Sequence, residues 1–233
     1  MVITAVPALS DNYIWVYEVD NQAIVVDPGE FDPICDYLTT RNLELKAILL
    51  THNHDDHTGG VKELVKKYED VPVYGPEETS EFNTKTVADE DEIELLGMTF
   101  HVFLTAGHTP GHISYLEKNH LFCGDALFSG GCGRVFTKDY AAQYDAIQKF
   151  NELHDDVKVY AGHEYTETNL TFAHDIEPDN RAVEEALKEV KTLRAENKKT
   201  LPSTIGEEKD INLFMQADSL EDFKSLRLKR DNI

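Results

Sequence analysis

The sequence predicts an α+β fold of layered sheets with helices outside them, followed by a helical region. Two observations lead to this prediction. Short apolar runs rich in β-branched residues alternate with helical patterns up to residue 176, as expected of sheets covered by helices. From residue 177 onward the chain reads instead as long, charged helices. We therefore expect a mixed domain over residues 1–176. We expect residues 177–233 to form a small helical region, too short to be stable unless it packs on that domain.

Each expected strand is a short apolar run bounded by turn residues. These runs lie at residues 2–6, 13–19, 23–27, 46–51, 71–74, 98–104, 113–116, 120–123 and 158–161. Apolar residues recur at helical spacing elsewhere, and the expected helices lie at residues 32–41, 60–68, 140–153, 180–198 and 219–229. Between the last two helices we expect a polar connection that contains residues 202–209.

The composition narrows the class of protein. The chain has 233 residues, 41% of them hydrophobic, and no apolar run long enough to span a membrane. Its amino terminus lacks the basic and apolar segments of a signal peptide, and its three cysteines are too few for a disulfide framework. We therefore expect a cytoplasmic protein that does not associate with membranes, and we expect it to be a monomer.

The charge is strongly acidic. Asp and Glu number 44 against 22 Lys and Arg, which gives a formal net charge of −22. Such a surface repels the phosphates of nucleic acids, which need clustered Lys and Arg. We therefore expect no nucleic-acid partner, and we interpret the excess as a well-solvated surface.

Five of the ten histidines share one context with one aspartate, because each follows an expected strand. They are His52, His54, His57, His108, His163 and Asp125. Loops that leave the strands at one edge of layered sheets converge in space. We therefore expect these side chains to form one site.

Residues 52–57, with the sequence HNHDDH, can serve two metal ions. In an extended chain, His52 and His54 point the same way and can hold one ion together. Gly59 and Gly60 then allow a sharp turn into a helix. That turn would redirect Asp56 and His57 toward a second position. Imidazole and carboxylate ligands suit zinc, iron or manganese.

Other histidines are expected outside the set of ligands. A lone histidine is more often a surface or core residue than a ligand, and we interpret His101, His120, His154 and His174 in this way. We expect His112 to lie beside the ligands and to support their orientation. Asp56 and Asp125 are the expected catalytic residues, acting as metal ligands.

The pattern His52-x-His54-x-Asp56-His57, with His108, Asp125 and His163 at these separations, resembles the metallo-β-lactamase fold superfamily. The resemblance implies a four-layer αββα sandwich with a binuclear metal site at one edge of the sheets. The small C-terminal helical appendage expected at residues 177–233 would be an addition to this sandwich, since most members of the superfamily lack it. Because this superfamily hosts many reactions, the pattern alone does not select a substrate.

Further segments resemble glyoxalase II, the hydroxyacylglutathione hydrolase family. They are PALSDNY at residues 7–13, GDALFSGGCGR at 124–134, GHEY at 162–165 and PSTIGEEK at 202–209. The resemblance runs from end to end and includes the helical region. It implies hydrolysis of S-lactoylglutathione and related S-2-hydroxyacylglutathiones to D-lactate and glutathione. This is the second step of methylglyoxal degradation.

The resemblance also implies a role for each matching position. One ion would be held by His52, His54 and His108, the other by Asp56, His57 and His163, and Asp125 would bridge them. Zinc is the expected metal, with iron or manganese as alternatives. Glutathione would contact Arg134, Phe136, Tyr165, Arg227 and Arg230. Phe136 and Arg230 stand where some members of the family have tyrosine and lysine, so one hydroxyl is missing and one charge has a different shape.

The expected reaction follows from two divalent ions and a thioester. The ions would make a bridging hydroxide available at neutral pH. The thiolate leaving group has a parent pKa of about 8.5 and needs no strong general acid to depart.

The same residues are compatible with other classes of protein to different degrees. An RNA-processing nuclease fits poorly with the acidic chain. A persulfide dioxygenase would use one iron and need not employ Asp56 and His163 as ligands. A lactonase would not need the basic final helix, which carries Lys224, Arg227, Lys229 and Arg230. A non-catalytic metal-binding protein would need no substrate pocket, so Arg134 and Tyr165 would have no function in it.

Overall fold

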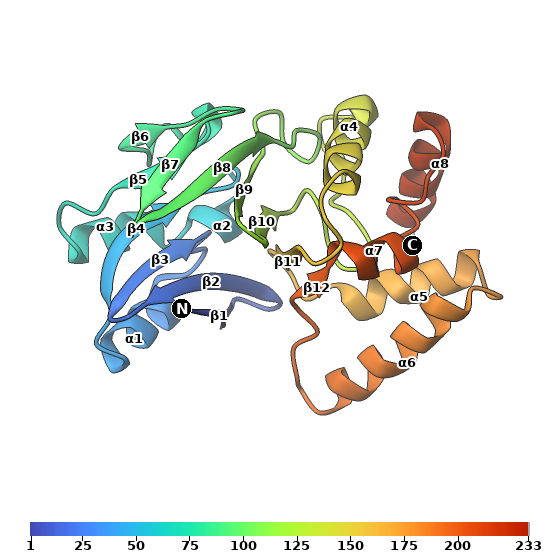
Figure 1. Cartoon of the computed structure of the whole chain (residues 1–233), viewed down its shortest axis with the longest axis horizontal. Coiled ribbons are helices and arrows are strands. Elements are labelled where there is room, and N and C mark those ends of the chain that lie inside the picture. Colours follow the sequence, from blue (N-terminus) through green and yellow to red (C-terminus); the bar gives the residue numbers. More distant parts are fainter. Residues whose placement is uncertain (233) are drawn as a thin grey trace. The chain divides into compact units, whose positions relative to one another are not determined.

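The computed structural model describes residues 1–232, which form two compact units. The first comprises residues 1–104 and 111–117, and the second comprises residues 105–110 and the chain from residue 118 onward. Their strands belong to two mixed sheets flanked by helices (Figure 1). Among the described residues, no helix is long and apolar enough to cross a membrane.

The first unit contains a sheet whose strands follow the order of the chain. They are β1 (Val2–Ala8), β2 (Asn12–Val19), β3 (Gln22–Val26), β4 (Glu44–Leu49), β5 (Val73–Gly75) and β6 (Lys85–Thr86). The first three are antiparallel, and the pairs from β3 to β6 are parallel. The same unit contains the antiparallel strands β7 (Glu92–Leu95), β8 (Met98–Leu104) and β9 (Ile113–Glu117).

Two helices cover one face of the β1–β6 sheet, α1 (Phe31–Thr40) and α3 (Val61–Lys67) (Figure 1). Their apolar residues recur at helical spacing, so one stripe of each helix turns toward the sheet. Ile34 and Leu38 of α1 and Leu64 of α3 are completely buried in one cluster with strand residues such as Val25 and Ile48. The unit also holds the short helices α2 (Asp55–Thr58) and η1 (Glu77–Thr79).

The other face of this sheet packs on strands β8 and β9. The rings of Tyr17 and Phe100 lie 5.7 Å apart, edge to face. The Tyr17 hydroxyl donates a hydrogen bond to Glu117 at 2.7 Å, and the Tyr115 hydroxyl donates to the carbonyl of Leu50 at 2.7 Å. A sheet covered on both faces explains why β2 is buried at nearly every position instead of at alternate ones.

The second unit contains three strands and the remaining helices. β10 (His120–Gly124) pairs in parallel with β11 (Lys158–Ala161), which pairs with β12 (Ser203–Thr204) in the antiparallel sense. The helices are α4 (Tyr140–Asn151), α5 (Thr166–Ile176), α6 (Arg181–Ala195), α7 (Ile205–Ile211) and α8 (Leu220–Asp231).

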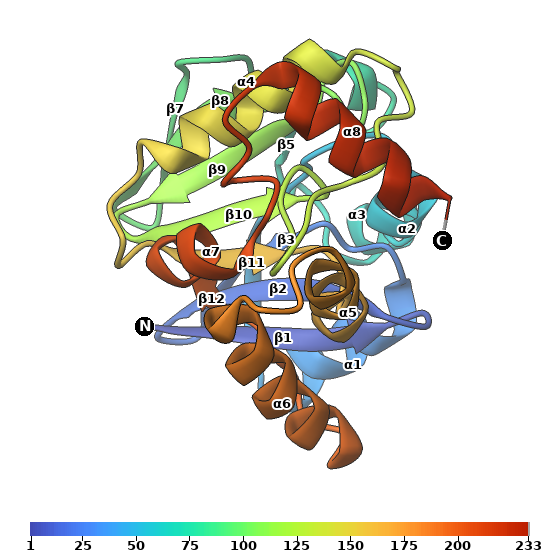
Figure 2. The same ribbon diagram turned by 90° about the vertical axis from the view of Figure 1, so that its right-hand side faces the viewer.

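Helices α5 and α6 lie side by side (Figure 2). Leu170 of α5 packs with Val183 and Leu187 of α6 in a cluster of their own. Two helices of this unit have side-chain N-caps. The side chains of Asn180 and Ser219 accept hydrogen bonds from backbone amides in the first turns of α6 and α8. These caps satisfy backbone amides that a helix cannot pair internally.

Two elements of the second unit differ from the sequence-based expectation. Helix α5 was not expected, because its stripe is short and mixed with Thr and Asn. The prediction that residues 202–209 lie in a polar connection is wrong, because these residues form β12 and most of α7. The sequence did contain the signal, since Thr204 and Glu207 form a capping box in which each side chain bonds the backbone of the other.

The packing of α3 on its sheet gives a prediction for stability. Leu64 has no exposed surface, so Leu64→Ala leaves a cavity and should lower the free energy of unfolding by about 2–5 kcal/mol. Lys66→Ala, two residues along on the exposed side of α3, should change it by less than about 0.5 kcal/mol. Urea unfolding followed by circular dichroism measures both values. Equal effects would contradict the described packing of α3.

Candidate metal centre

Four predicted ligands lie together in the first unit, directly after β4. His52 and His57 are buried, and His54 and Asp56 are partly exposed. The Nε2 atom of His52 lies 3.1 Å from Nδ1 of His54, and Nε2 of His57 lies 3.6 Å from Oδ2 of Asp56. The extended stretch before α2 places the first pair, as expected from the sequence. The second pair lies on α2 itself, a short helix that ends before Gly60 and was not expected.

The turn that carries Asp56 is held against the segment after β3. A Cβ atom built at Gly29 would lie 1.8 Å from the carbonyl oxygen of Asp56, and one built at Gly60 would lie 2.7 Å from the carbonyl oxygen of Pro28. Both distances are shorter than any real Cβ contact. Glycine is therefore required at both positions, because only its missing side chain allows the two backbones to approach so closely.

Asp27 is a further candidate residue of this cluster that was not expected from the sequence. Its carboxylate accepts hydrogen bonds from the Thr51 amide at 2.8 Å and the Thr51 hydroxyl at 2.7 Å, and its Oδ2 lies 3.0 Å from Nδ1 of His57. It also lies within possible metal-ligand distance of His52 and His57. Since the His57 ring is held through Nδ1, its Nε2 is left for a metal. The available signal was an acidic residue at the end of an apolar strand.

Two further side chains support this cluster. The Asn12 amide donates to the carbonyl oxygen of Asp56 at 3.2 Å and to its Oδ2 at 3.0 Å. His112 is completely buried and stacks on His52, with ring centroids 4.7 Å apart. These contacts agree with the expectation that His112 lies beside the ligands. Asn12 was present in the segment PALSDNY, but its contact with Asp56 depends on the fold.

The other three predicted ligands meet in the second unit. The Nε2 atoms of His108 and His163 each lie 3.4 Å from Oδ2 of Asp125, and all three residues are buried. Asp125 follows β10 and His163 follows β11. These strands are parallel neighbours, so their carboxyl ends reach the same edge.

The orientation of His108 is set by the backbone that follows Asp125. Nδ1 of His108 lies 2.8 Å from the carbonyl oxygen of Arg134, which leaves Nε2 directed at Asp125. Gly133 makes this approach possible, because a Cβ atom there would lie 2.1 Å from the carbonyl oxygen of Asp125 and 2.8 Å from Nδ1 of His108. This is the usual way in which a second contact fixes the tautomer and direction of a metal-binding histidine.

The donor sets of both units suit divalent metal ions. Five imidazoles and two carboxylates are ligands of zinc, iron and manganese. Two atoms bound to the same zinc ion in a tetrahedral site lie about 3.3 Å apart. The separations of 3.1 Å in the first unit and 3.4 Å in the second are close to this value. The residues present therefore fit a metal centre.

The residues expected to bind substrate all lie in the second unit. The ring of Tyr165 stacks on His163 with centroids 4.6 Å apart, and the ring of Phe136 stands edge-on to His108 at 5.3 Å. Phe136 has 59% of its surface exposed, and the Arg134 side chain is 57% exposed. Aromatic rings thus lie next to His108 and His163, and the Arg134 guanidinium lies 5.9 Å from the centre of the Phe136 ring.

The two arginines of α8 differ in their surroundings. Arg227 is only 5% exposed, and its guanidinium donates to the Cys132 carbonyl at 2.7 Å and contacts Asp231 at 2.8 Å. Asp231 also contacts Arg134 at 3.4 Å. Arg230 is half-buried; burial, followed by the charge of Arg227, lowers the pKa of its guanidinium.

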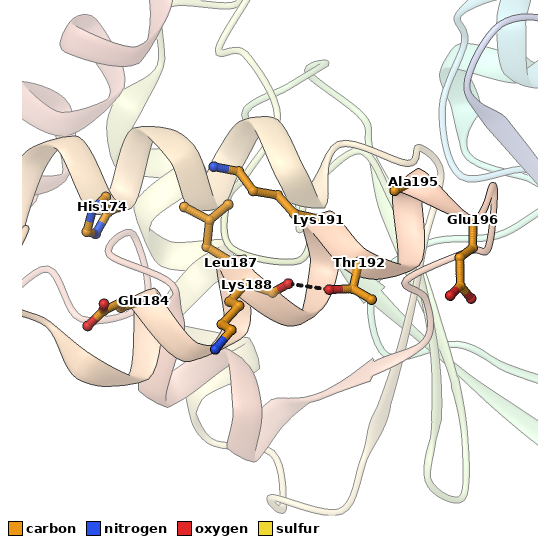
Figure 3. A pocket seen from close by; sticks show the side chains of 8 residues that line it. All are labelled: His174, Glu184, Leu187, Lys188, Lys191, Thr192, Ala195 and Glu196. Atoms are coloured by element: carbon orange, nitrogen blue, oxygen red, sulfur yellow. Dashed lines mark hydrogen bonds between the residues drawn. The ribbon is translucent and has the colours of Figure 1, made fainter.

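A separate surface hollow of about 680 Å³ runs along α6 (Figure 3). Its lining mixes Lys188 and Lys191 with Glu184 and Glu196, and Thr192 donates a hydrogen bond to the Lys188 carbonyl at 3.0 Å. It is lined by none of the predicted site residues.

The histidines expected outside the site have partners other than the predicted ligands. For example, His120 is buried, and its Nδ1 lies 3.0 Å from the Tyr160 hydroxyl.

Comparison with known proteins agrees with this fold. The profile of the metallo-beta-lactamase superfamily matches residues 9–163, which places the fold in that class. The profile described as the hydroxyacylglutathione hydrolase C-terminus matches residues 164–233. The chain belongs to the hydroxyacylglutathione hydrolase family. The predicted family and the layered α+β fold class are thereby confirmed.

Relatives match along the whole chain. The hydroxyacylglutathione hydrolase of Glaesserella parasuis serovar 5 is 54% identical over 231 residues, covering 99% of this chain and 98% of that protein. The protein of the same name from Haemophilus ducreyi is 46% identical and covers 98% of both chains.

Solved structures share the fold at lower identity. The crystal structure of ETHE1 from Myxococcus xanthus has a TM-score of 0.76 and 24% identity, covering 98% of this chain and 90% of that one. The structure of TTHA1623 in a di-iron-bound form has a TM-score of 0.63 and 23% identity, covering 92% of this chain and 100% of that one. Such neighbours show the architecture alone.

The contact between Asp27 and His57 gives a prediction about metal binding. Asp27→Asn keeps the size of the side chain but removes the negative charge that favours a proton on Nδ1 of His57. Metal affinity should fall roughly 10- to 100-fold, as measured by competition with a coloured chelator. Glu117→Gln, which neutralises another buried carboxylate of the first unit, should leave the affinity unchanged. Equal affinities for Asp27→Asn and the parent chain would exclude the orienting role.

Proposed function

We propose that the chain hydrolyses S-2-hydroxyacylglutathiones, above all S-lactoylglutathione, to a 2-hydroxy acid and glutathione. With S-lactoylglutathione the acid is D-lactate, and the reaction completes the removal of methylglyoxal. The supporting observation is membership of the hydroxyacylglutathione hydrolase family over both of its profiles. The clusters of histidine and aspartate supply the chemistry that such a hydrolysis needs.

The ligands of the proposed centre are shared between two ions. His52, His54 and His108 would hold the first, Asp56, His57 and His163 the second, and Asp125 would bridge them. The contacts within each unit support this division, because His52 lies next to His54, His57 next to Asp56, and Asp125 next to both His108 and His163. We propose zinc as the usual metal, with iron or manganese as alternatives.

The ions would supply hydroxide at neutral pH and stabilise negative charge on the carbonyl oxygen of the thioester. The chain's own residues keep this centre in order. Asp27 holds Nδ1 of His57, and the Arg134 carbonyl holds Nδ1 of His108, so each ring presents its other nitrogen. Asn12 holds the carboxylate of Asp56. The departing thiolate is stable enough in water to leave without a proton donor.

Substrate recognition is assigned to the second unit. Phe136 and Tyr165, which lie against His108 and His163, offer apolar surface for the glutathione backbone. Arg134 and Arg230 offer charge for its carboxylates. Arg227 adds positive potential while its guanidinium is engaged by Cys132 and Asp231. We propose that residues 1–176 are catalytic and that residues 177–233 serve mainly to bind substrate, in a cytoplasmic monomer.

The first functional prediction concerns activity and metal together. The purified chain should hydrolyse S-lactoylglutathione, lose this activity on treatment with a chelator, and regain it fully only with two equivalents of a divalent metal per chain. Thioester absorbance and elemental analysis measure the two quantities. His154→Ala, which changes a highly exposed histidine, should behave like the parent chain.

Two outcomes would overturn this proposal. One tightly bound iron, with oxidation of glutathione persulfide in place of thioester hydrolysis, would identify a dioxygenase. A preference for lactones over thioesters would identify a lactonase.

The second functional prediction separates substrate binding from chemistry. If Arg134 and Arg230 attract glutathione carboxylates equally before and during reaction, losing both should raise KM and leave kcat nearly unchanged. Exposed contacts of this kind contribute about 0.5–1.5 kcal/mol each, so the double alanine variant should raise KM roughly 10- to 100-fold. The effect should shrink at high salt, which screens exposed charges.

The matched control is Lys224→Ala. It also removes a positive charge from α8, but Lys224 lies over the ring of Tyr140, and its loss should leave KM unchanged. A fall in kcat at constant KM for the double variant would show that these arginines act on the metal centre and not on glutathione.

A further inference from the structure

The segment of residues 128–132, between Asp125 and Arg134, is a tight loop with little regular structure of its own. Its ends pair through two backbone hydrogen bonds, from the Phe128 amide to the Gly131 carbonyl at 2.9 Å and from the Gly131 amide to the Phe128 carbonyl at 3.0 Å. Gly130 has a positive φ of 68°, which favours glycine. We call this segment the 128–132 loop.

Side chains from three helices hold the backbone of this loop. From α5, Asn169 donates to the Ser129 carbonyl at 3.1 Å. From α8, Arg227 donates to the Cys132 carbonyl at 2.7 Å. Asn212, at the end of α7, donates to the carbonyls of Phe128 and Gly131 at 3.2 and 3.0 Å. A loop with so many backbone groups engaged in side-chain hydrogen bonds is fixed in one conformation.

Glu208 of α7 is the charged member of this arrangement. Its Oε2 accepts a hydrogen bond from the Gly130 amide at 2.8 Å and another from the Asn212 amide group at 3.1 Å. The side chain has no exposed surface, and burial raises the pKa of its carboxyl group. Burying a carboxyl group costs free energy that its hydrogen bonds must offset. One of these hydrogen bonds joins Glu208 to Gly130 at the tip of the 128–132 loop.

The loop is closely packed at the end nearest the proposed metal ligands. A Cβ atom at Gly131 would lie 2.6 Å from the Asn169 amide group, and one at Gly133 would lie 2.1 Å from the Asp125 carbonyl oxygen. The next carbonyl, that of Arg134, sets the direction of His108. A shift of the loop would therefore move Asp125 and His108, because the packed backbone leaves no space to absorb it.

We propose that Glu208 is a positioning residue for thioester hydrolysis. Its carboxylate fixes the Gly130 amide, and the 128–132 loop carries this constraint to Asp125 and to the carbonyl that orients His108. The role rests on the proposed function for its effect on activity. The helical region then contributes to the metal centre itself and not only to the recognition of glutathione.

The test compares Glu208→Ala with Glu208→Gln. The alanine variant should lower kcat/KM for S-lactoylglutathione roughly 10- to 100-fold, mostly through kcat, since a small misplacement of reacting groups is enough for such a loss. Glutamine retains an oxygen that can accept from Gly130, so it should restore most of the rate. Hydrogen exchange in the metal-free chain should become faster over residues 126–134 in Glu208→Ala and stay slow in Glu208→Gln.

The matched control is Glu207→Ala. It breaks the capping box of α7 and weakens the helix, but the described hydrogen bonds of Glu207 go to Thr204 and not to the 128–132 loop. If Glu207→Ala lost as much kcat as Glu208→Ala at an equal drop in melting temperature, Glu208 would be a structural residue only. Unchanged exchange over residues 126–134 in Glu208→Ala would also overturn the proposal.

Two further measurements apply if Glu208→Ala does not fold or if the parent chain is inactive. Should Glu208→Ala not fold, Asn212→Ala, which removes the donors to Phe128 and Gly131, must show the same fast exchange and low kcat for the proposal to stand. Should the parent chain not hydrolyse S-lactoylglutathione, the proposed function fails. The exchange measurements on the metal-free chain then still decide whether Glu208 fixes the loop.

Discussion

Burying imidazole and carboxylate groups costs free energy unless a second polar group holds each of them, and this requirement organises both units. In the first unit, Asp27 holds His57, and Asn12 holds Asp56. In the second unit, the Arg134 carbonyl holds His108. Each partner is delivered by a different strand end or loop. The local order of the ligands therefore depends on the packing of elements that are distant in the sequence.

Close approach of backbones is the second condition, and glycine makes it possible. Gly29 lets the turn of α2 lie against the segment after β3, and Gly133 lets the chain fold back on Asp125 and His108. Any side chain at either place would push a metal ligand out of position. These glycines are therefore part of the proposed site, although they offer no ligand atom.

Residues of the helical region also hold the backbone of the 128–132 loop. Arg227 is buried and bonded to the Cys132 carbonyl, while Glu208 and Asn212 bond the neighbouring backbone. By contrast, Arg134, which lies outside the helical region, is exposed, and Arg230 is half-buried. Under the proposed roles of Arg227 and Arg230, α8 would both support the 128–132 loop and contact the substrate.

Much of this protein was determined by the sequence alone. The alternation of apolar runs and helices indicated layered sheets, because this signal is local and periodic. The grouping of histidines after strands predicted a set of metal ligands for the proposed site. The resemblance of whole segments then indicated the family. Helix α5 and the element at residues 202–209 were not predicted, because their stripes are short and their burial comes from neighbours.

Other features were decided by the tertiary structure. Asp27 looks in the sequence like any acidic residue that ends a strand, and Glu208 looks like one more charge in an acidic chain. Only the fold buries them and places each beside one particular partner, His57 for Asp27 and Gly130 for Glu208. A hydrogen bond between residues far apart in the chain depends on distances that packing sets, and no local pattern of residues records such distances.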